Sequence, residues 1–175
     1  MRSTSPAKDL EHIQTARLVG ERLGPHAFDD IQRLYSDPDV MATLGGLQDA
    51  DRTRSHLDEA DQHWSEHGFG LWLLRDRDTA KFVGRAGLRH VNVGGQKEVE
   101  VAYAFLRPYW GRGLATEIAT ESVRIGFDSL RLVELVCFTL PSNGASQRVM
   151  EKAGFVRERE VEHRGIPHVL YRVVR

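Results

Sequence analysis

The chain holds one cysteine, no long apolar run and no excess of charge of either sign. A single thiol allows no internal disulfide, and Cys137 lies in the apolar run 135–138, which favours a buried side chain over a nucleophile or a metal ligand. No run approaches the roughly 20 apolar residues of a membrane span, and the N-terminus lacks a signal-type apolar stretch. We therefore expect a cytoplasmic protein with no membrane partner.

The charges nearly balance, at 24 Lys+Arg against 25 Asp+Glu, so no overall basic field attracts nucleic acid. We expect no nucleic-acid partner. A chain of 175 residues, 41% hydrophobic and 28% charged, is typical of one globular domain with a sizeable core. We expect residues 1–14 to be a frayed N-terminal segment and residues 15–175 to form the single domain.

Hydrophobic periodicity predicts a mixed α/β fold whose first half is rich in hairpins. The predicted strands cover residues 16–23, 71–74, 81–93, 98–106, 132–140, 155–162 and 168–174. The predicted helices are two short ones within 25–45, a polar one over 51–67, one over 114–128 and one ending near 153. A glycine turn at 93–96 joins two strands, and the helix over 114–128 is a crossover that places its flanking strands in parallel.

The most informative segment lies between a strand and a helix, and reads Tyr109-Trp110-Gly111-Arg112-Gly113-Leu114-Ala115-Thr116-Glu117. Glycines let the backbone approach a phosphate closely, and the unpaired N–H groups at a helix N-terminus favour an anion. A plain tight turn is the alternative. The Walker pattern is absent, and the dinucleotide pattern G-x-G-x-x-G fails at Thr116, where its third glycine belongs. A nicotinamide oxidoreductase therefore fits poorly.

This segment resembles the [Q/R]-x-x-G-x-[G/A] loop of the GNAT family, the GCN5-related N-acetyltransferases, with Gly113 and Ala115 at the last two fixed positions. Trp110 replaces Gln or Arg, as in the branch that acetylates the N-termini of ribosomal proteins, which commonly has Y-W-G-x-G-x-A-T-E here. Downstream, the stretch from Asn143 and Ser146 to residue 155 resembles the family pattern N-x-x-S-x-x-V-x-E-K-x-G-F. The resemblance covers almost the whole chain.

The resemblance implies a central, mostly antiparallel sheet flanked by helices and splayed between the family's fourth and fifth strands, here 102–106 and 132–140. The pantetheine arm of acetyl-CoA, the implied co-substrate, would lie in that splay. The implied acceptor is a primary amine of a small molecule or a protein N-terminus, and relatives are monomers or homodimers. The residues expected to bind acetyl-CoA are Phe105, Trp110, Gly111, Arg112, Gly113, Leu114, Ala115, Thr116 and Asn143. For Asn143, helix capping alone is the alternative.

The attacking amine needs a base, because an alkyl ammonium has no lone pair at neutral pH. Glu98 and Glu100 alternate with valines, so both carboxylates leave one face of a strand, about 6 to 7 Å apart. The resemblance favours the carboxylate three residues before Tyr103, which is Glu100, and Glu98 is then a solvent or substrate contact. The alternative for Glu100 is an exposed carboxylate or a simple recruiter of a cationic substrate.

The departing thiolate needs less help, since a thiol of pKa near 8 to 9 leaves well near neutral pH. Many family members place a proton-donating tyrosine seven residues after the motif's asparagine, but Met150 stands there. In the ribosomal-protein branch a serine takes that role, so the resemblance assigns it to Ser146. The alternative for Ser146 is local hydrogen bonding within the helix.

One competing motif is the H-x-x-E-H run His63 to His67, which occurs in zinc proteases. We reject that interpretation and expect no metal, because the helix is polar, ends at Gly68, and has no evident third ligand after it. Two alternatives to acetyl transfer stay open. They are a CoA-binding regulatory module without turnover and a transferase for another acyl-CoA such as succinyl-CoA.

Overall fold

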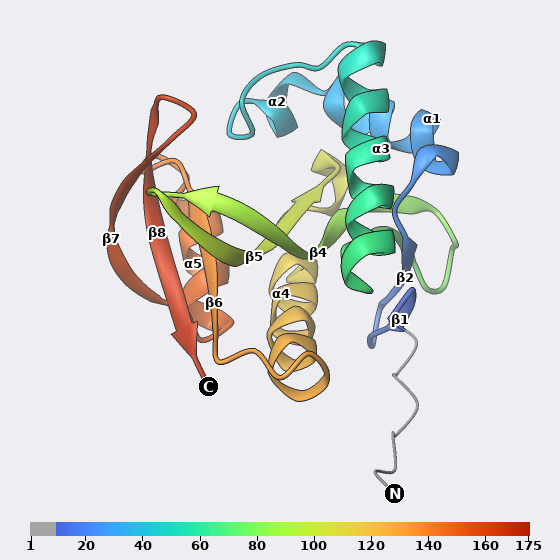
Figure 1. The fold of residues 1–175 in the computed structure, drawn as a ribbon. Helices are drawn as coiled ribbons and strands as arrows, with labels where there is room; N and C mark the ends of the chain where they lie inside the picture. Colours follow the sequence, from blue (N-terminus) through green and yellow to red (C-terminus); the bar gives the residue numbers. More distant parts are fainter. Residues whose placement is uncertain (1–9) are drawn as a thin grey trace, which may run out of the picture.

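The computed structural model describes residues 10–175, which form one eight-stranded sheet with helices on both faces (Figure 1). The strand order is β1-β2-β3-β4-β5-β6-β8-β7. The strands are β1 (His12–Gln14), β2 (Leu18–Arg22), β3 (Leu71–Asp76), β4 (Phe82–Val93), β5 (Gln96–Phe105), β6 (Glu134–Thr139), β7 (Val156–His163) and β8 (Ile166–Val174). The α-helices are α1 (Phe28–Tyr35), α2 (Pro38–Met41), α3 (Ala50–His67), α4 (Leu114–Arg124) and α5 (Gly144–Lys152).

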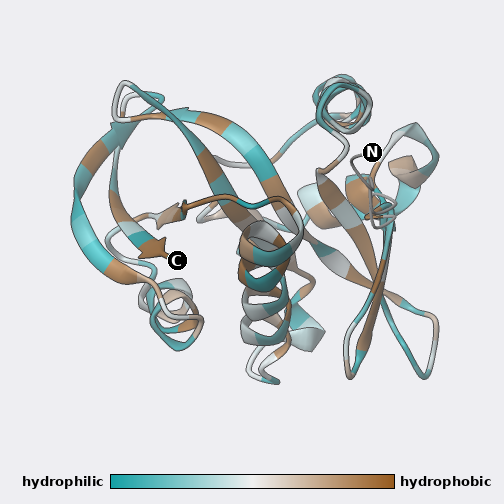
Figure 2. Ribbon diagram, turned by 60° about the horizontal axis from the view of Figure 1, so that its bottom comes forward, coloured by the Kyte–Doolittle hydropathy of each residue, from teal (hydrophilic) through white to brown (hydrophobic). Residues whose placement is uncertain are grey.

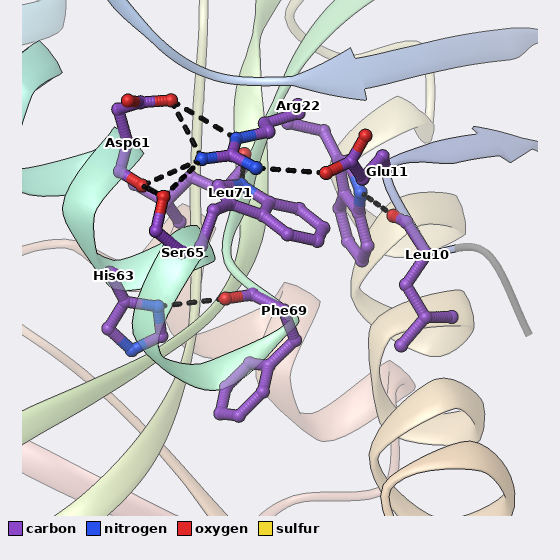
Figure 3. Close-up of polar contacts among 10 residues, drawn as sticks. Leu10, Glu11, Arg22, Asp61, His63, Ser65, Phe69 and Leu71 are labelled. Carbon is purple, nitrogen blue, oxygen red and sulfur yellow. Dashed lines mark hydrogen bonds and ion pairs between the residues drawn. The ribbon is translucent and has the colours of Figure 1, made fainter. Parts of the chain in front are cut away.

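The N-terminal segment differs from the expectation over its described part. Residues 1–9 of the frayed segment predicted at 1–14 lie outside the described residues, whereas β1 forms an antiparallel pair with β2. Leu10 is buried, and its carbonyl oxygen accepts a hydrogen bond from the indole of Trp72 at 2.7 Å (Figure 3). Within the described residues, the fold therefore already includes Leu10 and β1, upstream of Thr15. A short polar strand of three residues carries too little periodicity to be recognised from sequence.

The two larger hydrophobic clusters cover the two faces of the sheet, and a small third one gathers Val93, Val136 and Leu170. Leu34, Leu57 and Leu73 belong to the cluster under α1–α3, and Leu88 and Ile118 belong to the cluster under α4 and α5. Figure 2 shows α3 on one side of the sheet and α4 and α5 on the other, with hydropathy alternating along the long curved strands. No helix within residues 10–175 is both long and apolar enough to cross a membrane.

The helix boundaries follow from capping chemistry. The Asp49 carboxylate accepts from the backbone N–H of Arg52 at the start of α3, and Gly68 ends that helix in the left-handed conformation at φ 70°. The predicted helix over 114–128 is α4 followed by a π-helical turn, Ile125–Ser129. The backbone N–H of Leu132 bonds the carbonyl of Gly126 at 3.0 Å, which leads the chain into β6.

The shape of the middle of the sheet depends on how β5 and β6 pair. They are parallel neighbours joined by the α4 crossover, and their pairing is confined to Glu100 opposite Val136. By contrast, β4 and β5 form a continuous antiparallel pair. It runs from Val93 opposite Gln96 to Gly84 opposite Phe105. Beyond Glu100, β5 stays with β4 and departs from β6, so the sheet is splayed there. The sheet architecture predicted from the family resemblance is confirmed.

Candidate active site

A large cavity opens where β5 and β6 separate. Its volume is about 1420 Å³, and it extends from the face of α1–α3 to the β7–β8 hairpin. The residues with a role expected from sequence that line it are Glu100, Phe105, Trp110, Gly111, Gly113, Leu114, Ala115, Thr116, Asn143 and Ser146. Arg112 does not line it. That side chain is exposed, with its guanidinium 5.5 Å from the ring centroid of Tyr109.

The glycine loop presents backbone rather than side chains at the N-terminus of α4. Gly111 and Gly113 adopt the left-handed conformation, at φ 71° and 77°, and no side chain caps the helix. The first N–H groups of α4 are thus left for an external acceptor, and the helix dipole favours an anion there. A Cβ built on Gly111 would meet no atom within 4 Å, so the space beside the loop is open.

Trp110 fixes the loop against the sheet. Its indole N–H donates to the carbonyl oxygen of Phe105, at the end of β5, at 2.8 Å. The ring is still half-exposed at the cavity wall. The tryptophan in place of Gln or Arg therefore ties the loop to the last residue of the strand.

A brace from the connection between β1 and β2 supports the same loop, and sequence analysis missed it. The Glu117 carboxylate accepts from the hydroxyl of Thr15 at 2.5 Å and from the backbone N–H and Nε of Arg17 at 2.8 and 2.7 Å. Nη1 of Arg17 donates to the carbonyl of Arg112 at 2.7 Å. Burial of Glu117 opposes ionisation, but these hydrogen bonds outweigh it and lower the pKa of that carboxyl. No local pattern could reveal a partner about 100 residues away.

Asn143 caps α5 with both ends of its side chain engaged. Its Oδ1 accepts from the backbone N–H of Ser146 at 3.1 Å, and its Nδ2 donates to the hydroxyl of Thr139 at 3.0 Å. This is the capping geometry that the sequence left open as the alternative to pantetheine binding.

The Ser146 hydroxyl lies 2.9 Å from the hydroxyl of Tyr103 on β5, and the phenol also lies 3.2 Å from the Ser146 carbonyl. Burial raises the pKa of Tyr103, so the phenol keeps its proton. Met150 is buried in the core instead. Tyr103 therefore brings a phenolic hydroxyl to Ser146 from the sheet, which the motif spacing did not reveal.

Glu100 is 5% exposed and accepts from Nε of Arg89, directly across the β4–β5 ladder, at 2.8 Å. The charge of Glu100 raises the pKa of the Arg89 guanidinium. The hydrogen bond uses Oε2, and Oε1 has no partner among residues 10–175. The Glu100 carboxylate is thus buried, and only one of its two oxygens forms a hydrogen bond within residues 10–175.

Glu98 is largely shielded from solvent by an ion pair, whereas the expectation was a solvent or substrate contact. Its side chain is only 9% exposed, and it holds the guanidinium of Arg172 on β8 at 2.8 and 3.2 Å. Alternation placed both glutamates on one face, but it could not show that β8 supplies a cation opposite only one of them. Glu98 therefore links β5 to β8 across β6, on the side of Glu100 away from the splay.

The family profile described as "Acetyltransferase (GNAT) domain" matches residues 17–156. The chain belongs to the GNAT acetyltransferase family. GNAT membership makes it an acyltransferase that uses acetyl-CoA as donor and an amine as acceptor.

One relative aligns over most of the chain, and two solved structures share its fold. YkkB of Bacillus subtilis (strain 168), an uncharacterized protein, is 29% identical over 161 residues, covering 89% of this GNAT chain and 94% of YkkB. A GNAT-family protein from Bordetella pertussis has the same fold, with a TM-score of 0.81 and 24% identity, covering 92% of this chain and 98% of that one. A spermidine N-acetyltransferase from Vibrio cholerae, solved with CoA and spermine, has a TM-score of 0.73 and 15% identity over 91% of this chain and 96% of its own.

We predict that Glu117→Gln destabilises this GNAT domain by about 1–2 kcal/mol at pH 7, because the neutral amide weakens the brace. The pKa of Glu117 is lowered in the folded state, so its stabilisation is present above the unfolded pKa of about 4.5 and is lost as pH falls through the folded pKa. Urea titrations of wild type and variant between pH 3.5 and 7 measure this.

Glu121→Gln is the matched control on the same helix, since Glu121 pairs with the half-exposed Arg124 at 2.6 Å. Its loss of stability should stay below about 1 kcal/mol. If Glu117→Gln and Glu121→Gln have equal effects at pH 7, the brace contributes nothing special to the fold.

Proposed function

We propose that this protein transfers the acetyl group of acetyl-CoA to a primary amine, of a small molecule or a protein N-terminus, by direct attack in a ternary complex. The observation that carries the proposal is the cavity at the parting of β5 and β6. It brings the uncapped N-terminus of α4 together with the Glu100 carboxylate and the Ser146 and Tyr103 hydroxyls.

Each end of acetyl-CoA has a matching group in that cavity. Backbone N–H groups of residues 111–116 suit the pyrophosphate, because left-handed glycines and an uncapped helix supply donors without side-chain competition. The pantetheine arm suits the gap between β5 and β6, where both strands have backbone groups left without a ladder partner. Arg112 does not line the cavity, so its part in binding would be electrostatic.

The nitrogen loses two protons in the reaction, one from the ammonium ion before attack and one from the tetrahedral adduct, and the thiolate gains one; the second nitrogen proton restores the hydroxyl pair that protonates the thiolate. Oε1 of Glu100 accepts the amine proton through water, since its other oxygen holds Arg89. The amine then attacks the thioester carbonyl, whose developing negative charge is stabilised by backbone N–H groups of β5. The thiolate leaves and takes a proton from the paired hydroxyls of Ser146 and Tyr103, a step of modest value for a good leaving group.

We predict that Gly113→Trp abolishes acetyl-CoA binding, because any side chain at φ 77° strains the loop and an indole there covers the amides of α4. Calorimetric titration with acetyl-CoA, CoA, succinyl-CoA and NAD⁺ is the measurement. Gly165→Trp is the matched control, a turn glycine at φ 76° that does not line the cavity.

The expected result is micromolar acetyl-CoA binding by wild type and the control only. Binding of no CoA thioester by wild type would rule out the transferase, and tighter binding of succinyl-CoA than acetyl-CoA would change the donor. NAD⁺ binding in place of CoA would support an oxidoreductase instead.

We predict that Glu100→Gln lowers kcat about 100-fold at pH 7 with unchanged affinity for acetyl-CoA, because it removes the base and spares the cofactor loop. The ratio of the wild-type kcat to the Glu100→Gln kcat should fall toward pH 10, because the amine loses its proton unaided there. The assay measures release of the CoA thiol with the best acceptor from an amine panel. Glu98→Gln is the strand control, expected to lower Tm but to leave kcat within a few-fold.

An undiminished kcat in Glu100→Gln would remove Glu100 from the mechanism. CoA binding without thiol release from any amine would favour the regulatory module over the enzyme.

A further inference from the structure

The wall of the cavity under α1–α3 holds a buried cation with no counter-charge. Arg85 on β4 is 6% exposed and lines the cavity, and its Nε donates to the hydroxyl of Tyr35 at 2.6 Å. It forms no ion pair with any carboxylate of residues 10–175, whereas Arg89 pairs with Glu100. A buried charge without a partner is unfavourable, so a guanidinium left this way on a cavity wall is suited to an anionic ligand.

A second polar group, beside Arg85, has no hydrogen-bond partner. Nε2 of His56, on α3, is buried without a hydrogen bond, and the ring packs edge-on against Tyr35 with the centroids 5.3 Å apart. Burial, and next the charge of Arg85, lower the pKa of His56 to about 2, so the ring is neutral. A neutral imidazole with Nε2 protonated is a donor in need of an acceptor.

The sheet register places this group of side chains relative to Glu100. Arg85 lies opposite Ala104, and Arg89 lies opposite Glu100, on the same face of the β4–β5 ladder. The two arginines are four residues apart, about 13 Å along the strand. Between them Gly87 lies opposite Ala102, and Ala102 lines the cavity with a methyl group only.

We propose that the acceptor is an amino acid or other amine bearing a carboxylate, which pairs with Arg85 and accepts from Nε2 of His56 while its amine faces Glu100. The proposal deepens the function proposed above and rests on it. Arginine suits this task because its planar fork binds a carboxylate through two parallel hydrogen bonds. The same charge disfavours a purely cationic acceptor such as a polyamine.

The test compares each amino acid with its own amide as acceptor, in wild type, Arg85→Lys and Arg85→Met. In wild type kcat/KM for the best amino acid should exceed that for its amide by at least about 30-fold. Arg85→Met should bring this ratio close to one by slowing the amino acid alone, and Arg85→Lys should lie between. Arg157→Met, on the surface of β7, is the control and should leave the ratio unchanged.

A binding experiment distinguishes failure of the carboxylate site from failure of the proposed acetyltransferase activity. Amino acids, but not their amides, should raise the Tm of CoA-loaded wild type, and Arg85→Met should lose that rise while still binding CoA. Equal responses to acid and amide, or a rise retained in Arg85→Met, would overturn the carboxylate site. Failure of the transferase would instead be absence of thiol release from every acceptor.

A different observation concerns three histidines at the end of α3. His63 and His67 are one helical turn apart, His90 lies on β4, and one ligand nitrogen from each lies within 4.8 Å of the others. Nε2 of His63 and Nδ1 of His90 are 3.1 Å apart, close to the roughly 3.3 Å edge of a tetrahedron with zinc–nitrogen bonds of about 2.05 Å. The H-x-x-E-H run thus gains its third nitrogen from a strand rather than from a later helix.

The local structure prepares these rings for coordination. Nδ1–H of His63 donates to the carbonyl of Phe69 at 2.8 Å, which directs Nε2 toward His90 (Figure 3). Nε2 of His63 accepts from the backbone N–H of His90 at 3.0 Å, and a metal ion would replace that one hydrogen bond.

We infer that His63, His67 and His90 bind one zinc ion, with water as the fourth ligand, at the rim of the cavity that His63 and His90 line. The site would clamp the end of α3 to β4 rather than cleave peptides, because Glu66 lies against His67 at 3.7 Å instead of facing an open coordination position.

Calorimetric titration of untagged, metal-free protein with zinc chloride tests this site. Wild type and the control His26→Gln should bind one equivalent of zinc at micromolar concentration, and His67→Gln and His90→Gln should weaken that binding more than tenfold. Cobalt should give the visible absorption of a tetrahedral site. Absence of stoichiometric binding in wild type, or equal binding in the His90→Gln variant, would overturn the inference.

Discussion

The parting of β5 from β6 is the constraint on which the rest of this structure depends. Two neighbouring parallel strands cannot be joined by a tight turn, so the chain must cross over through α4. The crossover sets the N-terminus of α4 just beyond the end of β5. The crossover accounts for the position of this uncapped helix end, and the ladder broken after Glu100 opens the space beside it; together they make the cavity.

Close strand contacts on the other side keep β5 in place. A Cβ on Gly84 would lie 2.2 Å from the carbonyl oxygen of Ala104, and one on Gly87 would lie 2.3 Å from that of Gly70. No side chain fits at either position, so β4 lies tightly between β3 and β5. Because β5 is held firmly by β4, it can leave β6 without losing its own order. The splay is therefore compatible with a continuous β4–β5 ladder and is present without a ligand.

The sequence was informative wherever a short segment decides its own conformation. The left-handed glycines before α4, the Asn143 cap and the alternation in the long strands all depend on neighbours a few residues away, and these were predictable. Contacts between segments that are distant in the sequence were not predictable. Arg17 reaches Glu117 across 100 residues, and Glu98 meets Arg172 only because β8 pairs beside β6. Spacing in the sequence carries no information about such partners.

The same distinction divides the cavity into two halves. The half proposed to bind the cofactor presents backbone N–H groups at a helix end, and backbone geometry requires glycine at fixed positions, which leaves a motif in the sequence. The opposite half is built from side chains on α1, α3 and β4, including Tyr35, His56 and Arg85. Their chemistry depends on being brought together, and their separate positions follow no local pattern. Donor recognition can thus be inferred from the chain directly, whereas acceptor recognition becomes visible only in the folded structure.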